Sequence, residues 1–494
     1  MRVLFFFPST GYYNRAISNP LGLLAIASYL KQHGQEVKIV DRNIERGSLN
    51  RIFAEFQPDI VGISVMSVRG MTDAMRISKA AKRRGLTVIW GGQMPSMQPE
   101  LVLSCDYVDA VSYGEGELTW MDLLKAKECG EDFRTVPGMI FRSADGPGIE
   151  YSRERPFADL KDMAILDFTL IKTEKYLQPY LGCKRMIYLY SAKGCPGNCA
   201  FCPNTVFHKS TFRKRSIDTV IGEIKYLTEH FGVDGIYFSD ELWCIKRDDL
   251  LAFCDALKEN DIHIRWGIQL RIGMFNENDF QFLYDNGCRW VIFGIESGSA
   301  EIQKRIHKHL DFEKTRQTFE ITDRIGLTTI ASMIIGYPGE TEEQLRDSVR
   351  LINSIKASMV PIYHFTPLPG TELYREVVES GAYHPPRTIK EMAKTIATES
   401  LGQNFSQVQD RDLKVIRSWY NWKAFSNKQA IISKKKFEFA FDTIVSGIRA
   451  ISMKGPVSFL INGTAAFKEF IYTFWYAHAS PEIIKKYALN VENK

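Results

Sequence analysis

The sequence contains no long hydrophobic run and almost no excess of charge. No window reaches about 18 uninterrupted apolar residues, the length typical of a membrane-spanning helix, and the most apolar stretch, residues 457–477, is broken by Lys468 and Glu469. The 63 Lys and Arg residues nearly balance the 58 Asp and Glu residues, which leaves a formal net charge of +5. No basic stripe with interleaved aromatics is present either, so we expect neither a transmembrane segment nor a nucleic-acid partner.

A secretory signal and a disulfide framework are missing as well. Residues 1–8 form a short apolar run that ends at a proline, which is typical of a buried strand rather than of a signal peptide. Nine cysteines in 494 residues are too few for a disulfide framework, and three of them stand in one tight group. In a reducing compartment such a group indicates metal binding before disulfide bonding, so we expect a cytoplasmic protein.

Short apolar strands alternate with helical patterns over residues 1–140. This alternation predicts an α/β fold, with a doubly wound Rossmann-like domain whose ligands bind at the carboxyl ends of the strands. The expected strands are Val3–Phe7, Glu36–Val40, Ile60–Val65, Thr87–Trp90 and Tyr107–Val111, with helices over Leu21–His33 and Met71–Arg84.

Residues 138–156 are rich in Gly, Pro and charge, and we place a linker at residues 141–180. A second α/β series follows this linker. Six βα units over residues 181–385 predict a (βα)6 partial TIM barrel with its active site at the carboxyl mouth. Residues 386–494 lack strand patterns and predict a helical carboxyl-terminal region, whose aromatic residues are typical of a core. The expected barrel strands are Met186–Tyr190, Gly235–Phe238, His263–Gln269, Trp290–Ile295, Thr328–Ile335 and Val360–Phe365.

The three grouped cysteines, Cys195, Cys199 and Cys202, have the spacing C-x3-C-x2-C and follow the first barrel strand. Three thiolates on a tight Gly/Pro loop can bind three irons of a four-iron cluster and leave the fourth iron open for a substrate. The alternative is a structural zinc site with His208 as its fourth ligand. We favour the iron–sulfur cluster, because a closed zinc site has no reason to sit at a barrel mouth.

This loop resembles the signature of the radical S-adenosylmethionine (SAM) superfamily, in which an aromatic residue, here Phe201, precedes the last cysteine. Further segments match one large subgroup of that family: Phe-Ser-Asp-Glu at 238–241, Gly-Ile-Glu-Ser-Gly at 294–298 and Gly-Tyr-Pro-Gly-Glu-Thr at 336–341. The resemblance implies a [4Fe-4S] cluster held by the three cysteines and SAM bound at the barrel mouth.

The methionine part of SAM carries an ammonium and a carboxylate, so it needs acidic and cationic partners. Asp240 and Glu241 are candidates for the ammonium, Arg271 for the carboxylate and Glu296 for the ribose hydroxyls, and the resemblance places Phe201 near the adenine. Each charged residue has an alternative reading as a solvated or salt-bridged strand end. The full set of candidate SAM contacts is Phe201, Asp240, Glu241, Gln269, Arg271, Glu296 and Ser297.

The first domain resembles the cobalamin-binding subgroup of these enzymes, through Pro8, Gly91-Gly92 and the Gly-Glu-Gly-Glu of residues 114–117. Classical cobalamin carriers have Asp-x-His-x-x-Gly, whose His binds cobalt from below, but Asn43 stands in the place of that His. Cobalamin would therefore bind without a His lower ligand, although a domain that has lost cobalamin would show the same substitution. The candidate cobalamin contacts are Ser9, Asn43, Ser64, Ser67, Gly91, Gly92, Gly114, Glu115 and Gly116.

These resemblances together imply a cobalamin-dependent radical enzyme that transfers a methyl group to an unactivated carbon of a small molecule or natural product. The cluster would need a reductant such as flavodoxin or ferredoxin. A radical oxidoreductase or cyclase of the same architecture, with or without cobalamin, is the alternative. A corrinoid carrier or sensor is disfavoured, because it needs no three-thiolate cluster. A methylthiotransferase is also disfavoured, since no cysteine precedes Cys105 to bind a second cluster.

Overall fold

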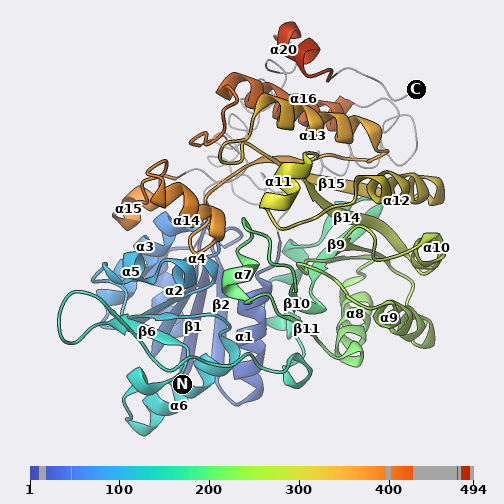
Figure 1. The fold of residues 1–494 in the computed structure, drawn as a ribbon. Helices are drawn as coiled ribbons and strands as arrows, with labels where there is room; N and C mark the ends of the chain where they lie inside the picture. Colours follow the sequence, from blue (N-terminus) through green and yellow to red (C-terminus); the bar gives the residue numbers. More distant parts are fainter. Residues whose placement is uncertain (11–17, 46, 396–401, 427–475, 477–479, 490–494) are drawn as a thin grey trace.

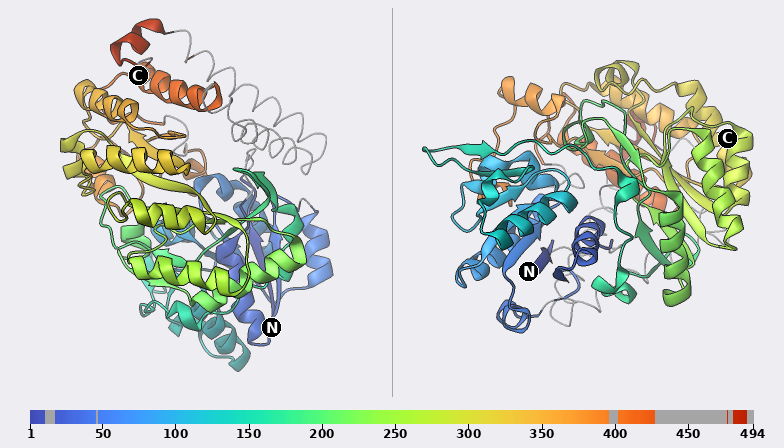
Figure 2. Two further views of the ribbon diagram at one scale, coloured as in Figure 1. Left: turned by 90° about the vertical axis from the view of Figure 1, so that its right-hand side faces the viewer. Right: turned by 90° about the horizontal axis from the view of Figure 1, so that it is seen from below.

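The computed structural model describes residues 1–10, 18–45, 47–395, 402–426, 476 and 480–489. Two α/β units lie side by side, and helices from the end of the chain lie over the second unit (Figure 1). Seen from below, the blue amino-terminal unit stands beside the green and yellow barrel unit (Figure 2, right). Among the helices that are described, none has both the length and the apolar character needed to cross a bilayer.

The first sheet has the strand order β2-β1-β3-β4-β5-β6-β7, and β1 to β5 are parallel. Apolar residues cover both of its faces, with Phe5 and Trp120 in the core on one side and Phe6 and Trp90 on the other. This confirms the doubly wound prediction, and the order reverses between β1 and β3, where such sheets bind ligands. The elements are β1 (Arg2–Phe7), α1 (Leu21–Gln32), β2 (Glu36–Asp41), α2 (Leu49–Phe56), β3 (Ile60–Ser64), α3 (Met71–Lys82), β4 (Thr87–Gly91), β5 (Ala110–Ser112) and α6 (Glu117–Cys129).

The linker expected at residues 141–180 is wrong at its start, because residues 139–151 belong to the first sheet. These residues form β6 (Met139–Arg142) and β7 (Ile149–Tyr151), an antiparallel extension of the first sheet beside β5. The Arg142 guanidinium fixes this extension by donating to the backbone carbonyls of Leu103, Cys105 and Val108 at 2.7–3.1 Å. The strand expected at Tyr107–Val111 also starts later, at Ala110, because residues 107–109 form a turn and an irregular segment before it.

The second sheet confirms the partial barrel. Its six parallel strands follow one another in sequence order, and the short β8 pairs antiparallel with the first of them. Its helices cover the outer side (Figure 1), and the strand ends differ from the predicted ones by a few residues. The strands are β8 (Gln178–Tyr180), β9 (Cys183–Leu189), β12 (Gly235–Phe238), β13 (Arg265–Leu270), β14 (Cys288–Glu296), β15 (Thr328–Ile335) and β16 (Ile362–His364). The helices are α8 (Ile217–Phe231), α9 (Arg247–Glu259), α10 (Glu277–Asp285), α11 (Ala300–Arg305), α12 (Phe312–Ile325) and α13 (Glu342–Ser354).

Among the described residues after β16 the regular elements are all helices, joined by irregular segments, and this agrees with the helical carboxyl-terminal region predicted over residues 386–494. Helix α16 (Asp410–Ser426) lies against the barrel, where the Tyr420 hydroxyl donates to Asn353 Oδ1 at 2.9 Å. Tyr420 is buried in the core, as expected for the aromatics of this region. Phe437, Phe439 and Trp475, and the side chains of Trp422 and Phe425, lie outside the described residues. The other described helices of this part are α14 (Glu372–Glu379), α15 (Ile389–Met392) and α20 (Pro481–Lys486).

Candidate functional site

The three cysteines lie on the loop between β10 (Ala192–Gly194) and α7 (Asn204–Phe207), which we call the cluster loop. The loop begins at Gly194, where φ is +82° and a Cβ would stand 2.2 Å from the Thr211 carbonyl oxygen. At Gly197 a Cβ would lie 3.5 Å from Cys195 Sγ and 3.9 Å from Cys199 Sγ. The backbone at Gly197 therefore lies next to both sulfurs.

Hydrogen bonds anchor the cluster loop on both sides. The Asn204 side chain accepts from the Cys195 N–H at 3.1 Å and donates to the Cys195 carbonyl at 2.7 Å. The Ala200 N–H donates to Ile306 O at 3.2 Å. Phe201 packs edge-on against Tyr337, with ring centroids 6.3 Å apart. The loop is thus held in place by contacts with the barrel.

The donor set of the loop fits an iron–sulfur cluster. Burial raises the pKa of the Cys202 thiol to about 12 and also raises that of Cys199, so without a metal both are protonated, and binding a metal would release their protons. His208, the fourth ligand of the zinc alternative, instead lies between Glu115 and Glu241, at 3.8 and 3.5 Å. No three His, Cys, Asp or Glu side chains in the described ranges are arranged around one ion. A four-iron cluster does not require that arrangement, since each thiolate binds a different iron.

Charged residues gather beside the cluster loop at the end of β14. Glu296 has φ +67°, uncommon for a residue with a side chain, and β14 shifts register beside it. Its carboxylate pairs with Lys308 Nζ at 3.0 Å, and the two side chains are only 11% and 14% exposed. Arg271 donates to Lys308 O at 3.4 Å, and its Nη1 lies 3.2 Å from the position of a Cβ on Gly197. Both signs of charge needed for an amino-acid ligand thus stand next to the cysteines.

Lys308 was missed by sequence reasoning. It belongs to no motif, and a lysine after a short helix is ordinarily solvated. Burial alone would lower its pKa, but Glu296 and the nearby Cys199 raise the pKa above its usual value. Gly294 leaves room for this pair, since a Cβ there would stand 2.3 Å from Glu296 Oε1 and 2.6 Å from Lys308 Nζ.

The other candidate SAM contacts have different environments. Asp240 is 1% exposed and accepts from the Ser191 N–H at 2.9 Å and the Ser191 hydroxyl at 2.6 Å. Burial raises its pKa to about 7. Ser297 is fully buried, with its hydroxyl 3.2 Å from that of Ser348. These two side chains therefore hold the fold together, whereas Gln269 is half-buried on β13, two residues before Arg271.

Glu241 lies on a different side from the one expected. Its Oε2 accepts from the Gly194 N–H at 3.0 Å, and its Oε1 lies 3.5 Å from His208 Nε2. Burial would raise its pKa, but the His208 hydrogen bond and the Gly194 N–H hold the pKa below its usual value. The carboxylate faces a cavity between the two units rather than Glu296.

That cavity joins the carboxyl ends of the first sheet to the start of the barrel. It comprises about 1070 Å³, including the part that opens to solvent. From the barrel side come Tyr190, Lys193, His208 and Glu241. From the first unit come six of the candidate cobalamin contacts, Ser64, Gly91, Gly92, Gly114, Glu115 and Gly116.

The remaining candidate cobalamin contacts do not line this cavity. Asn43 is 5% exposed, and its Oδ1 accepts from the Thr10 N–H at 3.0 Å while its Nδ2 donates to Asp41 Oδ1 at 2.9 Å. The Ser9 N–H donates to Asp73 Oδ2 at 2.9 Å. Asn43 therefore joins the loops after β1 and β2, and its side chain is committed to protein partners. Ser67 precedes a short 3-10 helix after β3.

An interdomain salt-bridge network forms one wall of the cavity, and it consists of Glu115, Glu117, Lys193, Arg213 and His208. Arg213 binds Glu115 through both terminal nitrogens, at 2.9 and 2.5 Å. Lys193 Nζ donates to Glu117 Oε1 at 2.7 Å and lies 3.7 Å from Glu115. Burial would raise the pKa of Glu115, but Lys193 and Arg213 lower it.

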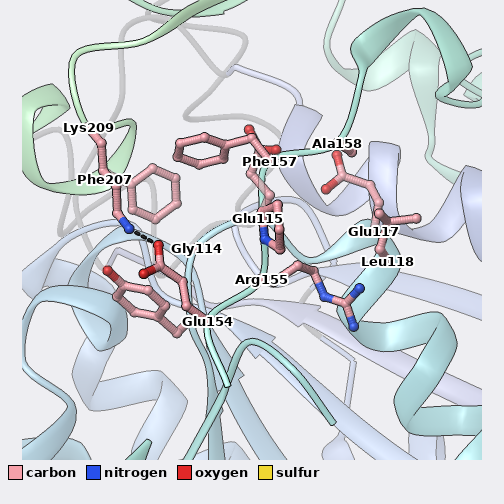
Figure 3. Close-up of a pocket in the computed structure, with 12 residues that line it drawn as sticks. Gly114, Glu115, Glu117, Leu118, Glu154, Arg155, Phe157, Ala158, Phe207 and Lys209 are labelled. Atoms are coloured by element: carbon pink, nitrogen blue, oxygen red, sulfur yellow. Dashed lines mark hydrogen bonds and ion pairs between the residues drawn. The ribbon is translucent and has the colours of Figure 1, made fainter. Parts of the chain in front are cut away.

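Glu115 and Glu117 also line a second, smaller pocket (Figure 3). The rings of Phe157 and Phe207 line it, and Lys209 pairs with Glu154 at its edge. Sequence reasoning missed this network apart from Glu115, because its ion pairs join residues 76 to 98 positions apart.

Two family models match the chain. The B12 binding domain matches residues 15–124, and the radical SAM superfamily matches residues 189–352. The chain is therefore a radical SAM enzyme with an amino-terminal B12-binding domain. It is similar to an uncharacterized methyltransferase of Pyrococcus horikoshii, with 28% identity over 366 residues, 73% of this chain and 78% of the relative.

Two further relatives differ in their reactions. Cytidylyl-2-hydroxyethylphosphonate methyltransferase of Streptomyces wedmorensis is 25% identical over 434 residues, 76% of this chain and 80% of the relative. Anaerobic magnesium-protoporphyrin IX monomethyl ester cyclase of Rubrivivax gelatinosus is 26% identical over 391 residues, 76% of this chain and 70% of the relative.

Solved structures share the fold. The radical SAM methyltransferase TsrM from Kitasatospora setae superposes with a TM-score of 0.70 and 17% identity, over 90% of this chain and 95% of TsrM. The cobalamin-dependent radical SAM enzyme OxsB superposes with a TM-score of 0.69 and 15% identity, over 99% of this chain and 80% of OxsB.

Proposed function

We propose that the chain is a cobalamin-dependent radical SAM methyltransferase that acts on an unactivated carbon of a small-molecule or natural-product substrate. The observation that carries this proposal is the cavity between the two units. The glycine-rich strand ends of the B12-binding domain form one side of it, and Lys193, two residues before Cys195, forms part of the other. A corrin held in this cavity would therefore lie close to the cluster loop.

The residues at each end of the site suit their cofactors. Cys195, Cys199 and Cys202 would hold a [4Fe-4S] cluster. When bound, the cluster supplies the electron that cleaves SAM, and cobalamin supplies the carrier of the methyl group. Arg271 would bind the carboxylate of SAM, as expected from the sequence. Because Asp240 is buried against Ser191 and Glu241 lines the cavity, we assign the ammonium to Glu296 in place of the ribose hydroxyls, with Lys308 fixing its position.

Cobalamin would be held by its ring and tail along Gly91, Gly92 and residues 114–116. At Gly92 φ is +93° and a Cβ would stand 3.1 Å from Val65 O, so the bare backbone is exposed to the cavity there. The Asn43 side chain is hydrogen-bonded to Thr10 and Asp41, so it would not serve as a cobalt ligand in place of the carrier His.

The partners and location follow from this chemistry. The cluster needs a one-electron donor, for which we propose a flavodoxin or ferredoxin. A cluster with an open iron survives only under reducing conditions, so we place the protein in the cytoplasm. The proposal includes no nucleic-acid partner.

Anaerobic reconstitution tests the proposal. The chain is loaded with iron, sulfide and hydroxocobalamin, reduced, and incubated with SAM carrying a deuterated methyl group. We expect about four irons and one cobalt per chain, together with 5′-deoxyadenosine in the products. Chains that retain cobalt but produce no 5′-deoxyadenosine would contradict the radical assignment. As a control, the Cys129→Ala variant, which changes an exposed cysteine far from the loop in sequence, should give the same iron content and the same products as the unaltered chain.

A radical cyclase is the second candidate, because the relative from Rubrivivax gelatinosus carries that name. Transfer of the deuterated methyl group to a product from an anaerobic extract separates the two. A cyclase would release 5′-deoxyadenosine without moving the label.

A further inference from the structure

The interdomain salt-bridge network stands between the cavity and the cluster loop. Glu115 and Glu117 follow β5 of the B12-binding domain, while Lys193 and His208 flank the cysteines on the barrel side. All four line the cavity. The side chains of Glu117 and His208 are only 6% and 9% exposed, so the charges are largely removed from solvent.

Lys193 is directly linked to the position of the cysteines. Its backbone lies opposite that of Arg213 in the antiparallel ribbon of β10 and β11 (Phe212–Lys214). The next residue, Gly194, is held on both sides: its N–H donates to Glu241 Oε2 at 3.0 Å, and its backbone passes so close to the Thr211 carbonyl that a Cβ would stand 2.2 Å from that oxygen. A displacement of Lys193 is therefore transmitted to Cys195, two residues further on.

Ion pairs and apolar contacts restrain an interface differently. A buried ion pair adds little stability over a well-packed apolar pair, but it has a preferred direction and punishes misalignment. The two-pronged contact between Arg213 and Glu115 adds a fixed plane to that direction. Apolar contacts carry no such direction of their own, since the hydrophobic effect is non-directional.

We propose that Glu115 and Glu117 are positioning residues that, through Arg213 and Lys193, fix the distance and orientation of the cluster loop relative to the cavity. This role deepens the proposed function, on which the identities of the two cofactors rest. Neither glutamate needs to touch a reacting atom for it. A positioning role gives a reason for charged side chains at a place that is largely closed to solvent.

Pulsed electron paramagnetic resonance measures the geometry directly. In the reconstituted, reduced protein the spins of Co(II) and of the reduced cluster couple through space. We expect one narrow distance distribution in the unaltered chain, and a broadened or shifted one in Glu117→Gln and Lys193→Gln at unchanged iron and cobalt content. The double variant Glu117→Gln with Lys193→Gln should broaden or shift the distribution no further than either single variant, because both single variants break the same ion pair. Glu150→Gln, in an exposed ion pair with Arg134, is the control.

Hydrogen exchange gives a second readout that needs no cofactor. In Glu117→Gln we expect the backbone amides of residues 192–195 to exchange roughly tenfold faster, with no change in Glu150→Gln. In Glu117→Gln, either an unchanged distance distribution or unchanged hydrogen exchange would overturn the positioning role. A chain that shows the faster exchange but retains no cobalamin or cluster would instead refute the proposed function.

Discussion

The ion pair between Glu296 and Lys308 allows the sharpest prediction about SAM binding. The Glu296→Gln substitution keeps the size of the side chain but removes its charge. The lost charge-assisted hydrogen bond is worth about 1.5–3 kcal/mol, which corresponds to a roughly 10- to 100-fold increase in the dissociation constant of SAM. Lys308 would also lose its partner at 3.0 Å while remaining largely buried, so the variant should unfold at a lower temperature.

Anaerobic calorimetric titration of the reconstituted protein with SAM measures this effect. The iron content should stay unchanged, because Glu296 is no ligand of the cluster. Glu277→Gln, in an exposed pair with Arg324 at 2.7 Å, is the matched control and should bind SAM normally. An unchanged dissociation constant in Glu296→Gln would mean that this carboxylate only holds Lys308 in place.

Three further predictions concern the cysteines, a buried carboxylate and the start of the cluster loop. Cys199→Ala should abolish the visible absorption of the four-iron cluster and all 5′-deoxyadenosine formation; a variant with both intact would remove Cys199 from the ligand set. Burial raises the pKa of Glu340 to about 7, so its folded form holds the proton more tightly than the unfolded chain. The stability it contributes is present near about pH 4 and lost as the pH rises through 7. Denaturant titrations should show this loss in the unaltered chain and a smaller one in Glu340→Gln; equal slopes would count against the buried, protonated state. Gly194→Ala should prevent cluster assembly, measured as iron content, because its Cβ would collide with Thr211 O; full iron loading would show that the loop can shift.

Both α/β units were predictable from local patterns. Parallel strands covered on both faces are short continuous apolar runs such as Val3–Phe7, and the helices between them repeat with a different period. The β6–β7 hairpin escaped prediction because its strands are only four and three residues long and lie among Gly and Pro. Its register depends on Arg142, whose three carbonyl partners lie 34 to 39 residues earlier in the chain.

The motifs of the candidate site were predictable from the sequence, but the directions of their side chains were not. Asp240 and Glu241 are neighbours in sequence and were assigned the same role. Both follow the end of β12 at Phe238, where the regular alternation of a strand no longer fixes the direction of a side chain. Asp240 is buried against Ser191, while Glu241 faces the cavity. Lys193 and Lys308 carry no signal in the sequence, because their partners are defined only by tertiary contacts.

The central claim is that this chain holds a site-differentiated cluster and cobalamin in neighbouring parts of one site. Electron paramagnetic resonance of the anaerobically reconstituted and reduced protein tests it most directly. We predict a reduced [4Fe-4S] signal that changes when SAM is added, and a Co(II) signal without nitrogen superhyperfine splitting, since Asn43 and its loop offer no imidazole below the metal. Nitrogen splitting from an axial ligand would contradict the predicted lower face, and a chain that retains no corrinoid would contradict the account as a whole.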